Sequence, residues 1–552
     1  MAPGVTPGGP ARAGREPVTS PDDLYRFAAC CFGMADGTGT DDRGNAPAGA
    51  PGNAPENAPE NKASGNRPEG GTARAAGLGN RLAGHPEPPA VGRAVGIETE
   101  WLVVDLARPA RRVPPAETLA ALTSLDGWLD GWAGRPGVPA DRLTDQAELP
   151  PLPGGSRVTF EPGGQFELSG PPRPLAAAVS ALASDLALAR AALHRAGLGL
   201  AGLGVDPLRP PGLVTTASRY TAMAEHFRSR CCHEGWTMMC STASVQVNLD
   251  VGGGPQAGAA AAGAQPAAGT ASTAVATRFR LAHALGPVLT AMFAASPVAA
   301  GRRTCWRSVR QTMWAEIDPT RTRAVLPLLP GTAEENWLAG RQAGQGPGGP
   351  CVADADLPGL WASYLRDAHM MMVADEGGRY LPVRGRVTFG DWMAGRGPVP
   401  RPPTLADLAW HATTLFPPVR PRGWLELRYL DAQPGDGWQV AVAVATALLD
   451  DPAAAEAALA VCLPVAHRWP AATTLGLRDE QLYRAANECA DLALAALERS
   501  WAASGLCAAV AAFTDRYTRR GRCPADDLVA RFTEVGPADL LREEAAQCAP
   551  VA

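Results

Sequence analysis

The sequence predicts an α+β fold, in which helices pack behind a sheet that has one polar face. Four segments alternate apolar and polar residues with the period of two that is typical of a β-strand. The polar side of each segment carries carboxylates, amides or arginine. Together the segments predict a sheet whose polar face carries the functional residues. Beyond Trp438 the pattern is helical, and we expect these helices to cover the back of the sheet. The strand-like segments are residues 95–105, 157–170, 242–250 and 424–431.

The segment 157–170, RVTFEPGGQFELSG, places Glu161 and Glu167 on either side of a Pro-Gly-Gly break. Apolar residues alternate with polar ones before and after the break, which predicts two short strands joined by a tight bend. Acid groups on a half-buried strand are costly unless a positive group meets them. Arginine or a hard cation such as Mg²⁺ would meet this need. Taken alone, the segment also fits a surface hairpin with solvated acids.

The other three segments favour the first interpretation. Each has an apolar face of Val, Leu, Ile or aromatic residues opposite its polar face. A single Glu-x-Glu strand is a weak signal, whereas four such strands in one chain indicate a common polar surface. Their polar faces carry Glu98 and Glu100, then Gln246 and Asn248, then Glu426 and Arg428.

Composition excludes several classes of protein. The chain has 552 residues, of which 46% are hydrophobic and 19% charged, as in an ordinary globular core. Its net charge of −5 supplies no basic patch, so we expect no nucleic-acid partner. No N-terminal apolar signal run is present, and the longest uncharged apolar segment, 284–301, is interrupted by Pro287 and Pro297. We therefore expect a cytoplasmic protein without a membrane partner.

Lysine and cysteine usage narrow the chemistry. The single lysine, Lys62, lies in a low-complexity region. A P-loop and a Schiff-base enzyme both need a lysine, so both are excluded for the folded part. Any phosphate must be held by arginine, backbone amides or metal. The 12 cysteines include no Cys-x-x-Cys pair, and no zinc site or disulfide framework is expected.

The segment 301–323 is dense in arginine and contains Trp306 and Trp314 at roughly helical spacing. A solvated basic helix would explain it. The two tryptophans favour instead a helix with one packed side and one functional arginine side, which makes Arg302 and Arg310 candidate site residues. The segment 411–420, HATTLFPPVR, leads into the last polar-faced strand and carries Thr413 and Thr414.

Several of these segments together resemble a known family. GIETEWLV, TFEPGGQFELSG, TMMCSTASVQVNLD, HATTLFPPVR and LELRYLD are similar to glutamate–cysteine ligases. The branch resembled includes plant enzymes and actinobacterial enzymes of ergothioneine biosynthesis. EPGGQFELSG is the most specific of these motifs. The resemblance spans roughly residues 20–541, interrupted by 33–90 and 252–273.

The resemblance implies a relative of glutamine synthetase, with a curved, mainly antiparallel sheet that holds metal ions and ATP. It implies the reaction of ATP, L-glutamate and L-cysteine to ADP, phosphate and γ-glutamylcysteine through a γ-glutamyl phosphate. Mg²⁺ is the expected ion, with Mn²⁺ as a substitute. Arg428 would face the transferring phosphoryl group, and Arg302 and Arg310 would bind substrate carboxylate or phosphate. Gln246 would be a weaker oxygen ligand of the metal or a nucleotide contact, and Asn248, Thr413 and Thr414 would contact nucleotide or substrate. The expected metal ligands are Glu98, Glu100, Glu161, Glu167 and Glu426.

The domain organisation follows from composition and this resemblance. We expect a disordered N-terminus (1–19), a helix of the catalytic domain (20–32) and a low-complexity insertion (33–90). The catalytic domain would span 91–437 with a flexible insertion at 252–273, and a helical part would span 438–552. Within these parts the patterns predict helices at 175–198, 219–227, 278–297, 364–375, 479–500 and 524–532, and a strand at 200–206.

Three alternatives stay open. A carboxylate–amine ligase of the same superfamily with another amine acceptor would share the metal and ATP residues. A metal-dependent hydrolase is a rival because paired carboxylates also serve glycoside hydrolysis. A non-catalytic binding protein on a ligase scaffold is the third. The expected partners are small molecules, and the sequence does not predict the oligomeric state.

Overall fold

The computed structural model describes residues 16–34, 93–123, 125, 149–215, 217–252, 268–326, 356–375, 377–500 and 504–546. Nearly all of the predicted disordered N-terminus and of the insertion 33–90 lies outside these residues. Residues 253–267 of the other predicted insertion also lie outside them. Its last residues belong to a helix that begins at Ala268, so that insertion is shorter than predicted.

The centre of the molecule is an antiparallel sheet. Its strands follow the order β10-β11-β5-β1-β3-β2, and β4 pairs with β1 beside this path. Every pairing in it is antiparallel, which confirms the predicted sheet type. The strands are β1 (Ala94–Asp105), β2 (Arg157–Phe160), β3 (Phe166–Pro174), β4 (Leu198–Ala201), β5 (Ser244–Asp250), β10 (Val419–Pro421) and β11 (Trp424–Asp431).

The register of the sheet aligns its polar residues across neighbouring strands. Glu100 of β1 lies opposite Glu167 of β3. On the other side of β1, Glu98 lies opposite Gln246 of β5. Directly paired residues share a face of the sheet, so the acids of separate strands are brought to one surface.

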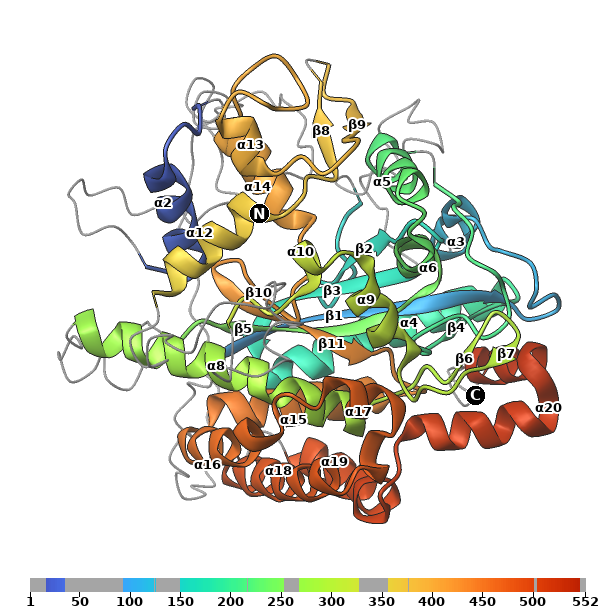
Figure 1. Cartoon of the computed structure of the whole chain (residues 1–552). Helices are drawn as coiled ribbons and strands as arrows, with labels where there is room; N and C mark the ends of the chain where they lie inside the picture. Colours follow the sequence, from blue (N-terminus) through green and yellow to red (C-terminus); the bar gives the residue numbers. More distant parts are fainter. Residues whose placement is uncertain are drawn as a thin grey trace, which may run out of the picture.

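Two groups of helices enclose the sheet (Figure 1). The apolar face packs on α4 (Leu175–Arg195), α8 (Ala268–Met292) and α15 (Gly437–Asp450). Alternate residues of β5 supply this contact, because Val245, Val247 and Leu249 are at most 1% exposed. Helix α15 is buried on nearly all sides, as its almost uniformly apolar sequence requires.

Further helices complete the lower layer and cover the polar face. Below α8 and α15 lie α16 (Pro452–Cys462), α18 (Glu480–Arg499) and α19 (Ser504–Arg516), whereas α17 (Trp469–Thr474) lies beside α15 and α20 (Pro524–Ala546) lies to their right in Figure 1. The upper group consists of α2 (Pro21–Cys31), α5 (Ser218–Ser229), α6 (His233–Ser241), α9 (Val309–Ile317), α10 (Pro319–Thr322), α12 (Leu357–Asp367), α13 (Phe389–Met393) and α14 (Leu405–Thr413). Helix α3 (Pro115–Leu122) packs on α4.

The remaining short elements of the described residues are two hairpins and three 3-10 turns. These are β6 (Val298–Ala299) with β7 (Arg302–Arg303), β8 (Met372–Ala374) with β9 (Tyr380–Pro382), and η2 (Leu463–Val465), η3 (Gly476–Arg478) and η5 (Thr518–Arg520).

The predicted N-terminal helix is confirmed as α2. Ser20 is its N-cap and accepts a hydrogen bond from the backbone of Asp23, whose carboxylate accepts one in return. This reciprocal capping satisfies two backbone donors at the helix start.

Some predicted boundaries were wrong. The predicted strand 200–206 ends as β4 at Ala201. The next residue, Gly202, lies so close to the Gln433 carbonyl that a Cβ there would be 1.9 Å from its oxygen. The predicted helix 364–375 starts earlier, as α12, and ends at Asp367, after which residues 372–374 form β8. The arginine-dense segment 301–323 is not one helix but a hairpin strand followed by α9 and α10.

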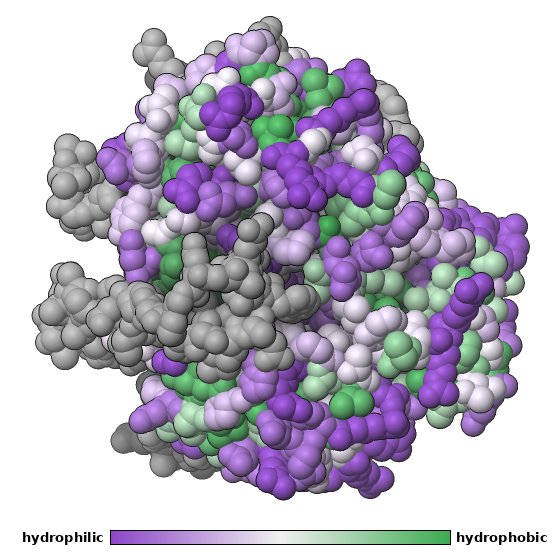
Figure 2. Space-filling model, viewed as in Figure 1, coloured by the Kyte–Doolittle hydropathy of each residue, from purple (hydrophilic) through white to green (hydrophobic). Residues whose placement is uncertain are grey.

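The surface in Figure 2 shows small, separate groups of hydrophobic residues among hydrophilic ones. In the described part of the chain, α4 alone has the length and apolar composition of a membrane-crossing helix. This is weak support for a span, since helices packed in a protein core pass the same test. Helix α4 packs against β1, β3 and β4.

Candidate active site

Four glutamates from the sheet converge in one cavity of about 290 Å³. We call them the acid cluster: Glu98 and Glu100 of β1, Glu161 of the β2–β3 bend and Glu167 of β3. One carboxylate oxygen of each of Glu100, Glu161 and Glu167 lies within 4.8 Å of the others. The structure thus brings three of the five acids predicted as metal ligands close enough to share an ion, and Glu98 and Glu426 line the same cavity.

The Pro-Gly-Gly bend places Glu161 in the cluster. The Glu161 carbonyl accepts a hydrogen bond from the Gly164 amide (2.8 Å), and Gly164 has φ +87°, which favours glycine. A Cβ at Gly163 would lie 2.0 Å from the Cys240 carbonyl oxygen. Any side chain there would push the bend away from α6, so this motif fixes the position of its acid.

The acid cluster is short of positive charge. Burial, followed by the neighbouring carboxylates, raises the pKa of Glu161 to about 8 and that of Glu98 to about 7. Burial also raises the pKa of Glu100 and Glu167. Buried carboxylates of this kind need either protons or a cation. The donors offered are all hard carboxylate oxygens, which suit Mg²⁺ or a similar divalent ion.

Glu426, the fifth predicted metal ligand, is engaged otherwise. Its carboxylate accepts hydrogen bonds from Nε (2.6 Å) and Nη2 (3.0 Å) of Arg420 and from Nη1 of Arg428 (2.6 Å). Burial acts to raise the pKa of Glu426, but Arg420, Arg428 and Arg422 outweigh it and hold the pKa far below its usual range. Its charge is balanced by these arginines, so Glu426 anchors them. Its carboxylate also lines the cavity beside Glu98, and its role as a metal ligand stays a prediction.

Arg428 crosses from β11 towards the acid cluster. Its Nη1 also donates to Oε1 of Gln246 (2.8 Å). Its guanidinium lies 5.2 Å from the centre of the Trp314 ring and 6.0 Å from that of Phe416. Within the described residues its buried Nε has no hydrogen-bond partner. The arginine is therefore held rigidly and keeps donor capacity for a ligand.

Arg310 lies behind Arg428 and not in the cavity. It is 1% exposed, and its Nη2 donates to the Arg428 carbonyl (3.1 Å). Its Nη1 is 3.9 Å from the buried carboxylate of Asp431. Arg310 therefore does not line the cavity where a substrate contact was expected. It supports Arg428 and Trp314 from beneath instead.

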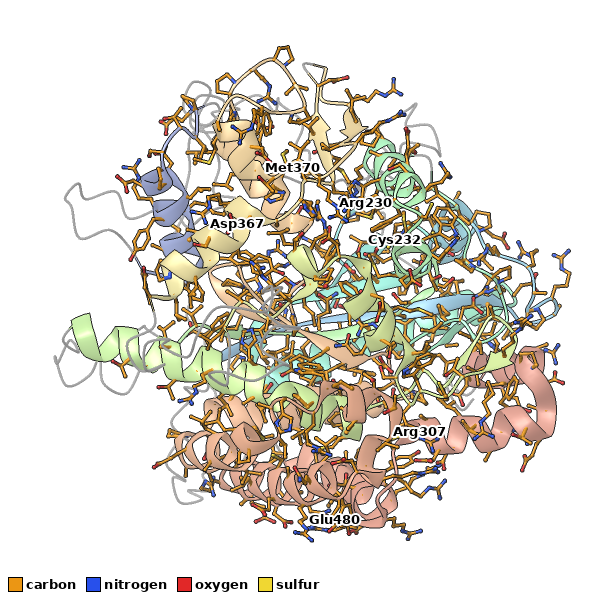
Figure 3. All side chains as sticks on the ribbon, viewed as in Figure 1. Arg230, Cys232, Arg307, Asp367, Met370 and Glu480 are labelled. Carbon is orange, nitrogen blue, oxygen red and sulfur yellow. The ribbon has the colours of Figure 1, made fainter. Side chains whose placement is uncertain are left out.

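Arg302 is not brought to the site, and its predicted catalytic role is withdrawn. It lies exposed in β7, whereas Arg310 lies in the first turn of the separate helix α9. Arg307, further along the same segment and labelled in Figure 3, lies next to the C-terminal helices. It pairs with Asp526 (3.2 Å) at the start of α20. The prediction failed because helical spacing was assumed through a hairpin.

The predicted amides and threonines contact the acid cluster or line the cavity. Gln246 donates to Glu100 (3.0 Å) and Asn248 donates to Glu98 (2.9 Å), so each amide orients one acid. Thr413 and Thr414 line the cavity, but their hydroxyl groups donate to backbone carbonyls of α14.

Three cavity arginines were missed by the sequence analysis. Arg219 of α5 donates to the Tyr220 hydroxyl group and acts electrostatically on Glu161. Arg420 and Arg422 lie in and just after β10. The segment VRPRGW offered a signal, because a residue paired with Glu426 across a hairpin must lie at Arg420.

A second cavity of about 300 Å³, the aromatic cavity, shares Arg428, Trp314 and Phe416 with the first. It is lined mainly by apolar and aromatic groups, including Trp306, Trp469 and several prolines. Arg428 therefore stands between two cavities of similar size and opposite chemistry.

A family model and several known proteins match most of this chain. The family model described as Glutamate-cysteine ligase family 2 (GCS2) matches residues 94–547. Over 462 residues the chain is 40% identical to glutamate–cysteine ligase EgtA of Mycolicibacterium smegmatis, covering 82% of this chain and 90% of that protein. It is 41% identical over 439 residues to the protein of the same name from Mycobacterium tuberculosis, covering 75% and 90%.

More distant similarities were also found. The chain is 29% identical over 398 residues to a chloroplastic glutamate–cysteine ligase of Medicago truncatula, covering 69% of this chain and 68% of that protein. A solved structure of glutamate–cysteine ligase from Francisella tularensis in complex with AMP aligns with a TM-score of 0.46 and 11% identity, covering 83% of this chain and 88% of that chain.

Proposed function

The chain belongs to glutamate–cysteine ligase family 2, and we propose that it joins the γ-carboxyl group of L-glutamate to the amino group of L-cysteine at the expense of ATP. The observation that carries the proposal is the convergence of the acid cluster with Arg428 in one cavity. Phosphoryl transfer needs positioning and neutralisation of charge more than covalent chemistry by the protein. The product, γ-glutamylcysteine, would enter the synthesis of ergothioneine.

The reaction requires activation of a carboxylate, which is a poor acylating agent. An oxygen of the glutamate γ-carboxylate would attack the γ-phosphorus of ATP, and the bond to ADP would break. The amino group of cysteine would then attack the acyl carbon of γ-glutamyl phosphate and lose a proton. Phosphate would leave with the former carboxylate oxygen.

Glu100, Glu161 and Glu167 would hold a divalent cation, with Glu98 next to them. When bound, the cation would neutralise negative charge on the nucleotide phosphates. Mg²⁺ is the ion that this all-oxygen donor set suits, and Mn²⁺ would use the same donors. Gln246 and Asn248 would keep the acids oriented through their hydrogen bonds.

Arg428 would contact the phosphoryl group during its transfer. A guanidinium binds phosphate oxygens with two parallel hydrogen bonds when its plane is fixed. Glu426 and the aromatic rings of Trp314 and Phe416 fix that plane here. Arg310 would act through Arg428 as a positioning residue, since it binds the backbone of Arg428.

An ADP-release assay with glutamate and a panel of amines tests the proposal. We expect ADP release that requires both glutamate and either cysteine or its isostere 2-aminobutyrate. Release with glutamate and a different amine would instead identify the related carboxylate–amine ligase. ATP turnover that is indifferent to glutamate would contradict both.

The cellular setting is part of the proposal. We expect the enzyme in the cytoplasm, acting on small molecules. Fractionation of the source cells with an antibody against the chain would test this, and recovery with the membranes would contradict it.

A further inference from the structure

Binding ATP poses an electrostatic problem for this cavity. The nucleotide brings several negative charges to a surface that already carries the acid cluster. Lys62 is the chain's one lysine and lies outside the described residues. Besides a cation, the phosphates therefore depend on arginine or backbone amides. Four arginines line the cavity: Arg219, Arg420, Arg422 and Arg428.

Arg420 has committed its donors within the protein. Nε and Nη2 bind Glu426, and Nη1 donates to the carbonyl groups of Thr413 (2.9 Å) and Leu415 (3.0 Å). It is 5% exposed. Arg420 therefore ties the start of β10 to β11 and has little left for a ligand.

Arg219 and Arg422 act on opposite parts of the acid cluster. Arg219 acts electrostatically on Glu161 and Glu167, whereas Arg422 acts on Glu98. Arg219 also donates to the hydroxyl group of Tyr220 and lies 4.2 Å from the centre of that ring. The two arginines thus serve different acids of the cavity, and Arg422 lies on the side of Glu426.

Arg422 is held in place but keeps its donors. Its guanidinium lies 5.1 Å from the centre of the Trp424 ring, and Nη1 is 3.9 Å from Glu426. Across the described ranges, no hydrogen bond from this guanidinium is found. Its side chain is 25% exposed at the rim of the cavity. Stacking on an aromatic ring fixes the plane of a guanidinium while leaving its N–H edges available.

The turn that carries Arg422 is rigid as well. The Arg422 amide donates to the Trp424 carbonyl (2.8 Å), and Gly423 has φ +82° in the tight link between β10 and β11. The Gly423 amide donates to the Cys31 carbonyl of α2 (2.8 Å). The side chain is thus presented from a turn bound on two sides.

We propose that Arg422 binds the β- and γ-phosphates of ATP at the end of the cavity formed by Glu98 and Glu426. This inference rests on the proposed function. Arg428 would bind the phosphoryl group in transfer, and Arg422 would bind the nucleotide from the open rim. The division suits a long polyanion, because one arginine is buried beside the reacting atoms and the other is partly exposed.

The test is substitution of Arg422→Gln in the full chain, with binding of ATP and AMP measured by calorimetry in the presence of Mg²⁺. We expect ATP to bind about tenfold or more weakly, because a charge-assisted bidentate contact is lost. AMP, which lacks the β- and γ-phosphates, should change less than twofold, as should the KM for glutamate. The ATP affinity of Arg422→Lys should lie between those of the wild type and Arg422→Gln. Arg303→Gln, which removes an exposed arginine of β7, is the matched control and should change nothing.

Unchanged ATP affinity in Arg422→Gln would overturn the assignment, as would a raised KM for glutamate with unchanged ATP binding. The proposed function fails by a different result. If the wild type lacks ADP release dependent on glutamate and cysteine, yet prefers ATP to AMP only when Arg422 is intact, the ligase activity is refuted and the phosphate site stands.

Discussion

The acid cavity and the aromatic cavity are nearly equal in size, about 290 and 300 Å³, yet they differ in what they can do. The acid cavity gathers five glutamates: the four of the acid cluster, from β1, β3 and the bend before β3, and Glu426 of β11. The aromatic cavity is lined by tryptophan and proline side chains with one exposed glutamate, Glu316. Arg428, Trp314 and Phe416 form the wall between them.

The difference shows that shape alone would not locate the chemistry. Ligand pockets are usually largely apolar with a few polar groups, and by that criterion the aromatic cavity is the better pocket. Perturbed carboxylates distinguish the acid cavity, because burial raises the pKa of Glu161 to about 8 there. Four predictions test whether the chemistry lies on the acid side of Arg428.

The largest expected effect follows Glu161→Gln. The amide preserves shape but removes the charge that holds a cation, so we expect ligation to be abolished in the ADP-release assay. The fold should remain intact, and the apo protein should unfold at a higher temperature because a buried, unbalanced carboxylate is gone. Glu316→Gln is the matched control in the aromatic cavity and should leave kcat within about threefold, as an exposed surface change does. Equal losses in both variants would contradict the comparison.

Arg428→Lys should come next, with kcat reduced about 100-fold, the usual cost of losing one preorganised donor to developing charge. Lysine, a single point charge, cannot reproduce the planar contact with Trp314 and Phe416 together with the hydrogen bonds to Glu426 and Gln246. The KM values should change much less than kcat. A variant with normal kcat and raised KM would indicate that Arg428 acts in substrate binding and not in phosphoryl transfer.

A smaller effect concerns stability against pH. The folded pKa values of Glu161 and Glu98, about 8 and about 7, exceed the ordinary 4.5. The folded state therefore binds more protons than the unfolded state between these limits, so stability present below pH 4.5 is lost as the pH rises towards 8. In EDTA the unfolding temperature should fall across this window. Mg²⁺ should raise it more at pH 8 than at pH 5, and Glu161→Gln should flatten both trends. A Mg²⁺ effect independent of pH would speak against binding at these carboxylates.

The smallest effect is expected from Arg302→Gln. Its side chain is exposed in β7, outside both cavities, so kcat/KM in the ADP-release assay should stay within about twofold. A loss comparable to that of Arg428→Lys would restore the withdrawn catalytic role.

The sequence predicted the acid cluster because the patterns that place these acids lie within short segments. Alternation with period two places Glu98 and Glu100 on one strand face, and the Pro-Gly-Gly bend sets Glu161 against Glu167. Antiparallel pairing then requires only that the polar faces coincide. The sheet type and the family resemblance were confirmed on this basis.

Tertiary contacts account for what was missed. The pairing of Glu426 with Arg420 of the neighbouring strand was not predicted, because it depends on which residues lie opposite each other in the hairpin. Arg302 and Arg310 shared one segment, but a hairpin and a helix separate them in space. Arg219 lies on α5, whose sequence gives no sign that this helix packs beside the acid cluster. These features depend on which elements pack together, and residue patterns do not contain that information.

The most direct test of the account is anomalous diffraction from crystals of the active enzyme grown with Mn²⁺. The account predicts an anomalous peak bounded by the carboxylates of Glu100, Glu161 and Glu167. An ion bound in the aromatic cavity or at the Arg420–Glu426 pair, with none at those three acids, would contradict it.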